Sequence, residues 1–549
     1  MVLARPARRW LILMTVANIL GHFGIGMAAA VGRNPGAAAE VADSRSLILN
    51  RALDAEPESL DPQLIHTIAG MRIANDLFEG LVHRAADAAI EAGVAKEWTT
   101  SIDGLHWTFV LRQTKWSNGQ PVTAADFVAA WRRAVTRATG SPSAWCFVTA
   151  GIKNAQAVID GTKEGSELGV QALSANTLRI TLQRPSPWLL ELLVLPVFFP
   201  LPTQQFDAHG GSWASMEPLV SNGAYRLKKR VLHEVLSFEF NPHYADQPPS
   251  VRQVNWYLQS SDKVAFDRYR VGELDMTLGV PVHHIGQLRD GTESGQLRTS
   301  HLLGTEYYAF NTRRAPFDKP ALRRALLLAL NRQQIADKVL NGGATAAVGF
   351  VPPYTAGLPD NWPATEQQSL QDRLKEAKRL YHAAGYSDEK PLKVTLLYNS
   401  NNTLQRVAIA ASAMWKKHLG AEVTLQTADS KTLIERSKRG SFDIIRASWV
   451  ADFNDPVSML HILGSQSSNN KAGYRSVTYD TLLKKLQVTG EQRHSALLRL
   501  KKVLENDAPV IPLYHYATPQ LISPRVKGWY DDPQGIVMSR YLSIAPSGR

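Results

Sequence analysis

The sequence predicts an α/β protein of about three domains. Its 549 residues exceed one domain, because domains typically hold roughly 100–200 residues. In the second half, strand-like and helix-like segments alternate, which is typical of a lobe with neighbouring parallel strands. In the first half, strands and helices mix without that regularity. A hydrophobic share of 44% and a charged share of 20% indicate an ordinary globular chain.

The first half contains several strand-like segments and one clearly marked helix start. Residues 123–126 read Thr-Ala-Ala-Asp, a capping box with Asp126 in place of Glu. The apolar positions of the helix that follows share one face, and they are Phe127, Ala130, Trp131 and Ala134. Strands are expected over 47–53, 106–111, 177–183 and 224–240.

The second half predicts strands separated by helices. One helix is expected to start at Pro320 and to carry Leu322, Leu326, Leu327 and Leu330, in a region that ends at Gly342-Gly343. Further helices are expected over 368–383, 403–419 and 430–438. Strands are expected over 392–398, 422–426 and 442–450. Ligands of parallel sheets bind at the carboxyl ends of the strands. For the last of these strands, that end is the segment just after Trp449.

The N-terminus has the pattern of a secretory signal peptide, which we place at residues 1–30. Three arginines precede an apolar run over 10–20, and small residues follow over 26–30. An uncleaved membrane anchor is the alternative, since residues 10–30 are nearly long enough to span a bilayer. No Cys lies near this region, so we expect an exported protein that is not a lipoprotein.

The charge balance does not indicate a nucleic-acid-binding protein. There are 61 Lys+Arg against 49 Asp+Glu, a net charge of +12. The excess is scattered over separate dipeptides such as Arg132-Arg133 and Lys416-Lys417, rather than gathered in one basic stripe. The single Cys excludes an intramolecular disulfide and a zinc site built from Cys pairs.

No standard catalytic motif is found, and we expect neither an enzyme nor a cofactor. G-x-S-x-G, H-E-x-x-H and G-x-x-x-x-G-K-[ST] are all absent. His283-His284 is the best metal candidate, but adjacent side chains in a strand point to opposite faces, so we interpret the pair as solvated loop histidines. Cys146 lies among apolar residues, which indicates a buried thiol rather than a nucleophile.

Residues 442–456 contain the strongest candidate binding residues. A buried-looking strand carries Arg446 and Trp449 and is followed by Asp452. Asp452 could hold a ligand ammonium by charge-assisted hydrogen bonds, and Trp449 could supply an apolar wall. Arg446 could keep the site neutral or clamp a ligand carboxylate. The alternative is structural: a helix-capping Asp and an internal ion pair.

Short motifs spread over nearly the whole exported chain carry a resemblance to a known family. They are Ser59-Leu60-Asp61-Pro62, Asp76-Leu77-Phe78-Glu79-Gly80-Leu81, Trp107-Thr108-Phe109, Trp116-Ser117-Asn118-Gly119, Pro121 to Phe127, Ser221-Asn222-Gly223-Ala224-Tyr225, Tyr307-Tyr308 with Asn311, Leu396-Leu397-Tyr398-Asn399, Met414-Trp415-Lys416-Lys417 and the stretch 442–456. In this order they resemble the periplasmic oligopeptide-binding proteins of ABC importers, extracellular solute-binding protein family 5, including its murein-peptide-binding branch.

This resemblance implies a type II periplasmic-binding-protein clamshell, with two lobes, an extra domain and a hinge between the lobes. The implied domains are domain I from 40–78, 202–303 and 519–549, domain II from 79–201, and domain III from 304–518. The segments on either side of domain III would act as hinges. The lobes would close on an extended peptide whose backbone pairs with protein strands.

The resemblance also implies the ligand-binding residues. Asp452 matches the Asp that holds the free α-amino group of the peptide, and Arg446 matches a buried Arg near it. The other ligand-binding residues that we expect are Trp449, Ser448, Asn399, Tyr307 and Tyr516, together with His66 and Ser143, which replace an acidic residue and a Tyr of the family pocket.

Two departures from the family pattern stand out. The positions that receive the peptide carboxylate in relatives hold Ser437, Leu340 and Leu404, none of them charged, although Arg436 and Lys438 flank Ser437. The lobe disulfide of the family is absent, and Gly304 and Val450 stand at its two positions.

The expected function is a non-enzymatic, monomeric periplasmic receptor that captures oligopeptides and delivers them to the membrane permease of an ABC importer. Ligand-stabilised closure of the lobes would be its mechanism. The alternatives are a receptor of the same fold for cell-wall peptides or another cationic solute, an envelope peptide-binding chaperone, and a secreted hydrolase.

Overall fold

A computed structural model describes residues 47–291, 294–362 and 367–545. The chain divides into the units Met1–Arg45 and Ser46–Arg549, and every described residue belongs to the second. The signal-peptide prediction for residues 1–30 lies outside the described residues. Within the described ranges, no helix has the length and apolar character needed to cross a membrane.

The predicted parallel strands form one side of a six-stranded sheet. The order of its strands is β12 (Ala344–Ala346), β16 (Val510–Leu521), β11 (Leu297–Phe310), β15 (Ile444–Val450), β13 (Lys393–Asn399) and β14 (Glu422–Ala428). β13 pairs in parallel with β14 and with β15, as the alternation of strands and helices predicted. β15 also pairs antiparallel with β11, and β11 with β16, so the sheet is mixed.

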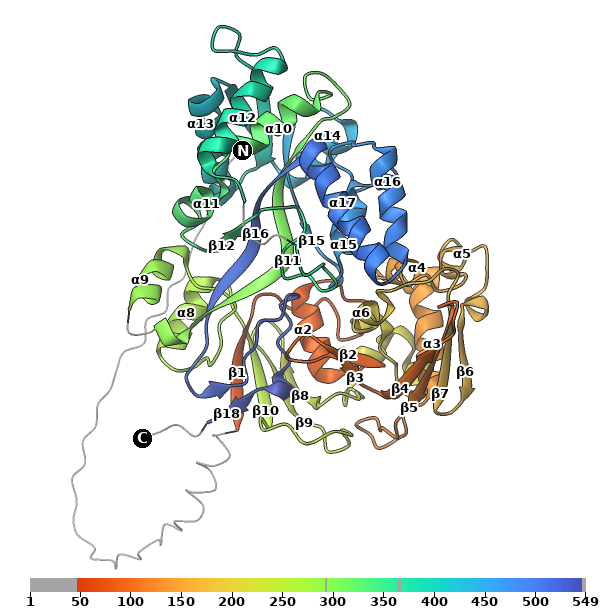
Figure 1. The fold of residues 1–549 in the computed structure, drawn as a ribbon. Coiled ribbons are helices and arrows are strands. Elements are labelled where there is room, and N and C mark those ends of the chain that lie inside the picture. The colour runs from red at the N-terminus through yellow and green to blue at the C-terminus, as the bar shows by residue number, and fades with distance from the viewer. Residues whose placement is uncertain (1–46, 292–293, 363–366, 546–549) are drawn as a thin grey trace, which may run out of the picture. The chain divides into compact units, whose positions relative to one another are not determined.

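Helices cover both faces of this sheet. They are α10 (Pro320–Leu328), α11 (Arg332–Gln334), α12 (Leu370–Ala383), α13 (Asn402–Leu419), α14 (Ser430–Arg439), α15 (Pro456–Leu460), α16 (Val477–Lys484) and α17 (Glu491–Asp507). Figure 1 shows α12 and α13 on the opposite side of β11 and β16 from α16 and α17. In the core beneath α13, the indole of Trp415 donates a hydrogen bond to the Leu326 carbonyl at 2.8 Å.

The first half of the described chain builds two smaller sheets and a hairpin. One sheet has the order β1 (Ile48–Leu53), β10 (Gln253–Leu258), β9 (Val235–Phe240) and β8 (Tyr225–Val231). The other has the order β4 (Ala95–Thr100), β5 (His106–Leu111), β7 (Thr177–Thr181) and β6 (Val170–Ser174), and the hairpin pairs β2 (Val82–Arg84) with β3 (Ile90–Ala92). The strand expected over 224–240 is thus two strands, which turn at His233 with a φ of 61°.

The helices of this region include the one whose start was marked in the sequence. α3 (Ala124–Val135) begins directly after Thr123, and the Asp126 carboxylate accepts a hydrogen bond from the Thr123 backbone N–H at 2.8 Å. The capping prediction is therefore confirmed. The other helices are α2 (Ile68–Leu77), α4 (Trp145–Thr149), α5 (Ala155–Ile159), α6 (Leu189–Leu193), α7 (Thr203–His209), α8 (Asp262–Arg270) and α9 (Ile285–Asp290).

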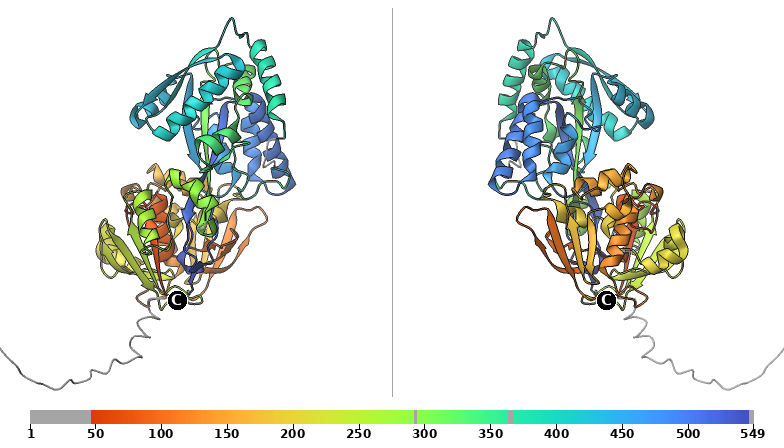
Figure 2. Two further views of the ribbon diagram at one scale, coloured as in Figure 1. Left: turned by 90° about the vertical axis from the view of Figure 1, so that its left-hand side faces the viewer. Right: turned by 90° about the vertical axis from the view of Figure 1, so that its right-hand side faces the viewer.

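Two long strands connect the two groups of elements. Figures 1 and 2 show the elements of residues 48–284 in one group and those of 320–507 in another, with β11 and β16 running between them. These strands cross the positions 303/304 and 518/519, where the domain boundaries are expected. Their pairing register shifts between His301 and Thr305. The short pair β17 (Val526–Lys527) and β18 (Ser543–Ile544) follows β16.

The structure shows the surroundings of the three residues considered as chemical candidates, Cys146, His283 and His284. Cys146 is buried, and burial raises the pKa of its thiol well above the usual value. His283 and His284 end a short 3₁₀ helix, Val282–His284, and not a strand, so their ring centroids lie 4.2 Å apart. His283 is exposed as expected, whereas the half-buried His284 stacks on Phe266. Across the described residues, no group of three or more His, Cys, Asp or Glu side chains is placed to hold a metal ion.

Candidate functional site

Asp452 lies in the loop between β15 and α15, where the sequence placed it. Its backbone N–H donates to the Ser458 hydroxyl at 2.8 Å, and its carbonyl accepts from the Gln534 amide at 3.2 Å. The loop is therefore held from α15 and from the C-terminal segment. The Asp452 side chain is left to project from a fixed backbone.

The structural alternative for Asp452, helix capping, belongs to a different residue. Asp455 caps α15 by accepting a hydrogen bond from the Val457 backbone N–H at 2.8 Å. Asp455 is also the buried partner of Arg493, whose Nη2 lies 2.6 Å from each carboxylate oxygen. Asp452 itself has no side-chain hydrogen bond or ion pair with any other described residue.

Three of the expected ligand-binding residues line one cavity of about 110 Å³. Asp452 reaches it from the loop after β15, while His66 and Ser143 come from the first half of the chain. The remaining lining is largely apolar and consists of Ile65, Met71, Pro142, Trp145, Cys146, Leu195, Pro196 and Val197. A carboxylate at the end of a mostly apolar pocket suits a ligand that carries a cationic head.

The electrostatics of the cavity depend on the isolation of Asp452. Burial raises the pKa of its carboxyl from 3.8 to about 6, because desolvation disfavours the charged form and no nearby cation offsets it. The Asp452 charge also contributes, after burial, to the raised pKa of the Cys146 thiol. At neutral pH the site therefore presents a half-buried anion without a counter-charge.

Four other expected residues form a second group on one face of the sheet. Arg446 binds the buried carboxylate of Glu306 through Nε and, at 2.5 Å, through Nη2. Its Nη1 donates to the Asn399 side chain at 3.2 Å, and the Tyr516 hydroxyl donates to Glu306 at 2.7 Å. Ser448 lies opposite Glu306 in the pairing of β15 with β11.

The pair fixes the charge state of Arg446. Burial would lower the pKa of its guanidinium, but the hydrogen bonds and charge of Glu306 outweigh burial and hold that pKa above its usual value. Arg446 therefore does not neutralise Asp452; its geometry is that of the structural alternative, an internal ion pair with Glu306. Glu306 takes the Nε–Nη2 edge of Arg446, so a ligand carboxylate would meet a guanidinium whose charge Glu306 already neutralises.

Trp449 and Tyr307 lie apart from these two groups. Side chains of a strand alternate between faces, and both residues are on the opposite face from Glu306 and Arg446. The Trp449 indole donates to the Ser458 carbonyl at 2.8 Å and packs edge-on against His461. Tyr307 is only 2% exposed and packs edge-on against Phe350, so the structure places it in the core.

The edge of β15 that faces β13 is unpaired over the residues just before Asp452. β13 pairs with β15 only at Ile444 and Ile445, whereas β11 pairs with it through Val450. Within the described residues, no strand therefore follows the β13 side of β15 from Arg446 to Val450. An extended ligand chain could add there as a strand, because its backbone would satisfy the open edge.

Glu306 is the main site residue that sequence reasoning missed. A signal was present, since Glu306 precedes the apolar segment Tyr307 to Phe310, where an acid must be paired to be buried. Ser458 and Gln534, which hold the Asp452 loop, gave no local signal.

The departures from the family pattern have clear structural settings. Ser437 and Leu340 are buried, and Leu404 packs against the core beneath α13. Gly304 and Val450 face each other in the pairing of β11 with β15. A Cβ at Gly304 would lie 2.4 Å from Cδ2 of Tyr516, so the Tyr516 ring occupies the space that a larger residue would need.

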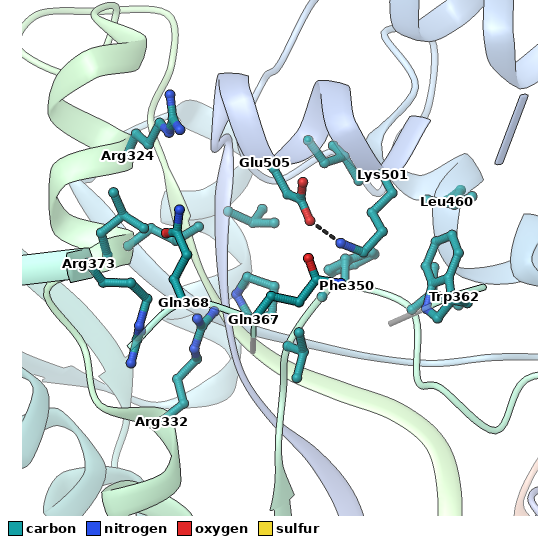
Figure 3. Close-up of a pocket in the computed structure, with 18 residues that line it drawn as sticks. Arg324, Arg332, Phe350, Trp362, Gln367, Gln368, Arg373, Leu460, Lys501 and Glu505 are labelled. Atoms are coloured by element: carbon teal, nitrogen blue, oxygen red, sulfur yellow. Dashed lines mark hydrogen bonds and ion pairs between the residues drawn. The ribbon is translucent and has the colours of Figure 1, made fainter. Parts of the chain in front are cut away.

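A larger cavity, of about 320 Å³, is lined by residues of the 320–507 group and by Val510 and Pro512 of β16 (Figure 3). Its apolar lining includes Phe350, Trp362 and Leu460, and Lys501 forms an ion pair with Glu505 at its wall. It shares no lining residue with the Asp452 cavity. None of the expected ligand-binding residues lines it.

Comparison with known proteins places this geometry in context. Residues 89–471 match the model of the bacterial extracellular solute-binding proteins, family 5 Middle. The chain is 39% identical to the periplasmic murein peptide-binding protein MppA of Escherichia coli K12, over 92% of this chain and 94% of MppA. It is 37% identical to the periplasmic oligopeptide-binding protein OppA of Salmonella typhimurium, over 92% and 93%. It is 38% identical to the probable deoxycholate-binding periplasmic protein YgiS of E. coli K12, over 89% and 92%.

Solved structures of periplasmic peptide-binding proteins are also similar to this chain. The unliganded open form of MppA superposes with a TM-score of 0.84 at 39% identity, over 91% of this chain and 97% of that chain. Haemophilus influenzae OppA in complex with RPPGFSPFR superposes with a TM-score of 0.71 at 36% identity, over 91% and 99%.

Proposed function

Because the chain belongs to family 5 of the bacterial extracellular solute-binding proteins, whose type II clamshell α/β fold it shares, we propose that it is a periplasmic receptor for oligopeptides. In this proposal, Asp452 holds the free α-amino group of the ligand, and the receptor delivers the peptide to the permease of an ABC importer. It acts as a monomer and catalyses no reaction.

The observation that carries the proposal is the isolated carboxylate of Asp452. It is half-buried, and burial raises its pKa to about 6, while no other described residue donates a hydrogen bond to its side chain. A ligand ammonium would supply the missing counter-charge and donors. Since Arg446 is already held by Glu306, the strongest unsatisfied charge in this region calls for a cation.

The open edge of β15 supports an extended ligand. A peptide whose amine lies at Asp452 can run along residues 446–450 and form backbone hydrogen bonds there. Backbone pairing makes few demands on side chains, which suits a receptor for varied peptides. The apolar lining of the 110 Å³ cavity would receive the first residue of the ligand.

The structure is more similar to an open, ligand-free form of a relative than to a peptide-bound relative. The TM-score is higher for the unliganded open form of MppA than for OppA bound to its peptide. We propose that β11 and β16, which cross between the two groups of elements, act as the hinge. The register shift between His301 and Thr305 lies beside the expected boundary at 303/304. Ligand binding would then favour a closed state.

Calorimetric titration with matched peptides tests the proposal. Peptides of two to five residues are compared with their N-acetylated forms, on the wild type and on Asp452→Asn. We expect binding to require the free amine and to weaken by about 2–5 kcal/mol in Asp452→Asn, as when one partner of a buried charge pair is removed. Glu435→Gln, on the exposed side of α14, is the matched control and should bind normally.

Cell-wall peptides with a free amine are the second candidate ligands, favoured by the 39% identity to a murein peptide-binding protein. They would be titrated alongside the oligopeptides. Tighter binding of cell-wall peptides would keep the amine anchor and change the ligand class. Equal binding of free and acetylated peptides would contradict the anchor and favour a chaperone. Binding of deoxycholate in place of every peptide would contradict the oligopeptide proposal.

A further inference from the structure

Glu306 is a buried acid that lies just beneath the surface that a ligand on β15 would touch. Its side chain is 1% exposed, whereas that of its partner Arg446 is 20% exposed. Asn399, Ser448 and Tyr516 around the pair are each half-buried. The pair therefore lies directly beneath an accessible polar surface, and its net charge determines what that surface attracts.

The bonds around Glu306 are complete. One carboxylate oxygen faces Arg446 Nε, and the other lies 2.5 Å from Arg446 Nη2 and 2.7 Å from the Tyr516 hydroxyl. The remaining Arg446 nitrogen donates to Asn399. The other ionisable groups that act on Arg446 are the phenols of Tyr514 and Tyr516. No second carboxylate is present among the described neighbours, so one acid neutralises one base.

This arrangement determines which ligand group can lie there. An arginine fork is the preferred binder of a carboxylate, but here Glu306 takes the Nε–Nη2 edge of Arg446 from inside the protein and neutralises its charge. A ligand carboxylate approaching Arg446 would meet a neutralised cation and would lie close to the buried Glu306 anion, which disfavours it. The anion-binding capacity of Arg446 is therefore switched off by a residue of the same sheet.

We propose that Glu306 is a specificity-determining residue, which excludes anionic ligand groups from the surface around Arg446. This inference rests on the proposed peptide-binding function. Arg446 lies six positions before Asp452, at most about 20 Å of extended chain. A peptide anchored at Asp452 therefore reaches Arg446 within about six residues. The ligands that this surface would select are peptides with a free amine and a neutral segment beside Arg446. Any carboxylate of such a peptide would lie away from Arg446.

The test measures how Glu306→Gln changes discrimination against a carboxylate. Peptides of two to six residues with a free amine are titrated as C-terminal acids and as C-terminal amides. In Glu306→Gln, the acid-to-amide affinity ratio is expected to rise at least tenfold for the length that places the carboxylate near Arg446, and to stay unchanged for other lengths. Tyr516→Phe, which removes a bond to Glu306 but leaves its charge, should not change the ratio.

A purely structural role for Glu306 gives a different result. Glu306→Gln would then weaken acids and amides equally at every length, and the unchanged ratio would overturn the inference. If Glu306→Gln does not fold by circular dichroism, Arg446→Gln tests the same pair from the other side. It should leave Glu306 without its cation and raise the affinity for a lysine at that ligand position at least tenfold over norleucine. No such gain would also overturn the inference.

A second readout separates this inference from the peptide-binding proposal. The unfolding midpoint of Glu306→Gln is measured in sodium acetate and in sodium chloride of equal ionic strength. Acetate should raise the midpoint of the variant relative to chloride, and it should have no such effect on the wild type. If no peptide binds the wild type, the proposed function fails, and the acetate comparison still decides whether Glu306 blocks an anion site. Equal effects of the two salts on both proteins would overturn the inference.

Discussion

The side-chain amide of Gln534 donates a hydrogen bond to the main-chain carbonyl of Asp452 at 3.2 Å. Its amide oxygen also accepts a hydrogen bond from Arg84 at 3.2 Å, and Arg84 pairs with Glu191. One C-terminal side chain thus ties the loop of the candidate amine anchor to residues of the first half of the chain. Since Asp452 has no side-chain partner in the described structure, its position depends on such backbone contacts.

Removing this contact should weaken ligand binding without abolishing it. In Gln534→Ala the Asp452 loop keeps its bond to Ser458 but loses its link to the C-terminal segment. We expect peptide affinity to fall by about 0.5–1.5 kcal/mol, the usual contribution of one hydrogen bond. Gln492→Ala, on the exposed side of α17, is the matched control. Unchanged affinity in Gln534→Ala would show that the loop does not need this contact.

Ligand binding should depend on pH through Asp452. Burial raises the pKa of its carboxyl to about 6 in the empty site, so the carboxylate is ionised at pH 7 and mostly protonated at pH 5. Affinity for free-amine peptides should fall about tenfold per pH unit below pH 6. Titrations from pH 4.5 to 7.5 measure this, and the weaker binding left in Asp452→Asn should stay level over that range. A flat profile for the wild type would contradict the anchor role.

The same raised pKa predicts a stability difference in the absence of ligand. The folded state binds the Asp452 proton more tightly than the unfolded state, so the stabilising contribution of the protonated form is complete below about pH 4. It is lost as the pH rises to about 6. At pH 7, Asp452→Asn should therefore be more stable than the wild type by on the order of 2–3 kcal/mol. Urea unfolding at pH 4 and pH 7 checks this, and a pH-independent difference would contradict it.

The buried pair of Asp455 and Arg493 should matter for folding rather than for binding. Both side chains are less than a tenth exposed, and Asp455 also caps α15. Asp455→Asn should lower the free energy of unfolding by about 3–5 kcal/mol, because it leaves Arg493 buried without its counter-charge. Lys263→Gln, which removes an exposed ion pair with Asp267, should change it by less than about 1 kcal/mol. Similar effects of the two variants in urea unfolding would refute this account.

The fold was most predictable where local patterns decide it. The segments near 392–398, 422–426 and 442–450 alternate with helices, and they form the parallel strands β13, β14 and β15. The partners β11 and β16 were not predicted as strands. Both are long, mostly buried strands. Their antiparallel pairing joins residues more than 200 positions apart, and no local periodicity in the sequence indicates such pairing.

In the candidate site, too, local features were predictable from the sequence and long-range contacts were not. The position of Asp452 just after β15 was predictable, because the end of a parallel strand is a local feature. The partner of Arg446 was not, since Glu306 lies 140 residues away and meets it only when β11 and β15 pair. The resemblance suggested Tyr307 as a ligand contact, but the alternation of side chains places it in the core, while Glu306 beside it faces Arg446.

A crystal structure of the protein with a bound peptide tests the central claim most directly. The account predicts that the ligand α-ammonium lies about 3 Å from the Asp452 carboxylate. It also predicts that the ligand backbone pairs with the open edge of β15 between Arg446 and Val450. A ligand whose amine faces solvent, or one that occupies the cavity of Figure 3 and leaves Asp452 unpaired, would contradict it.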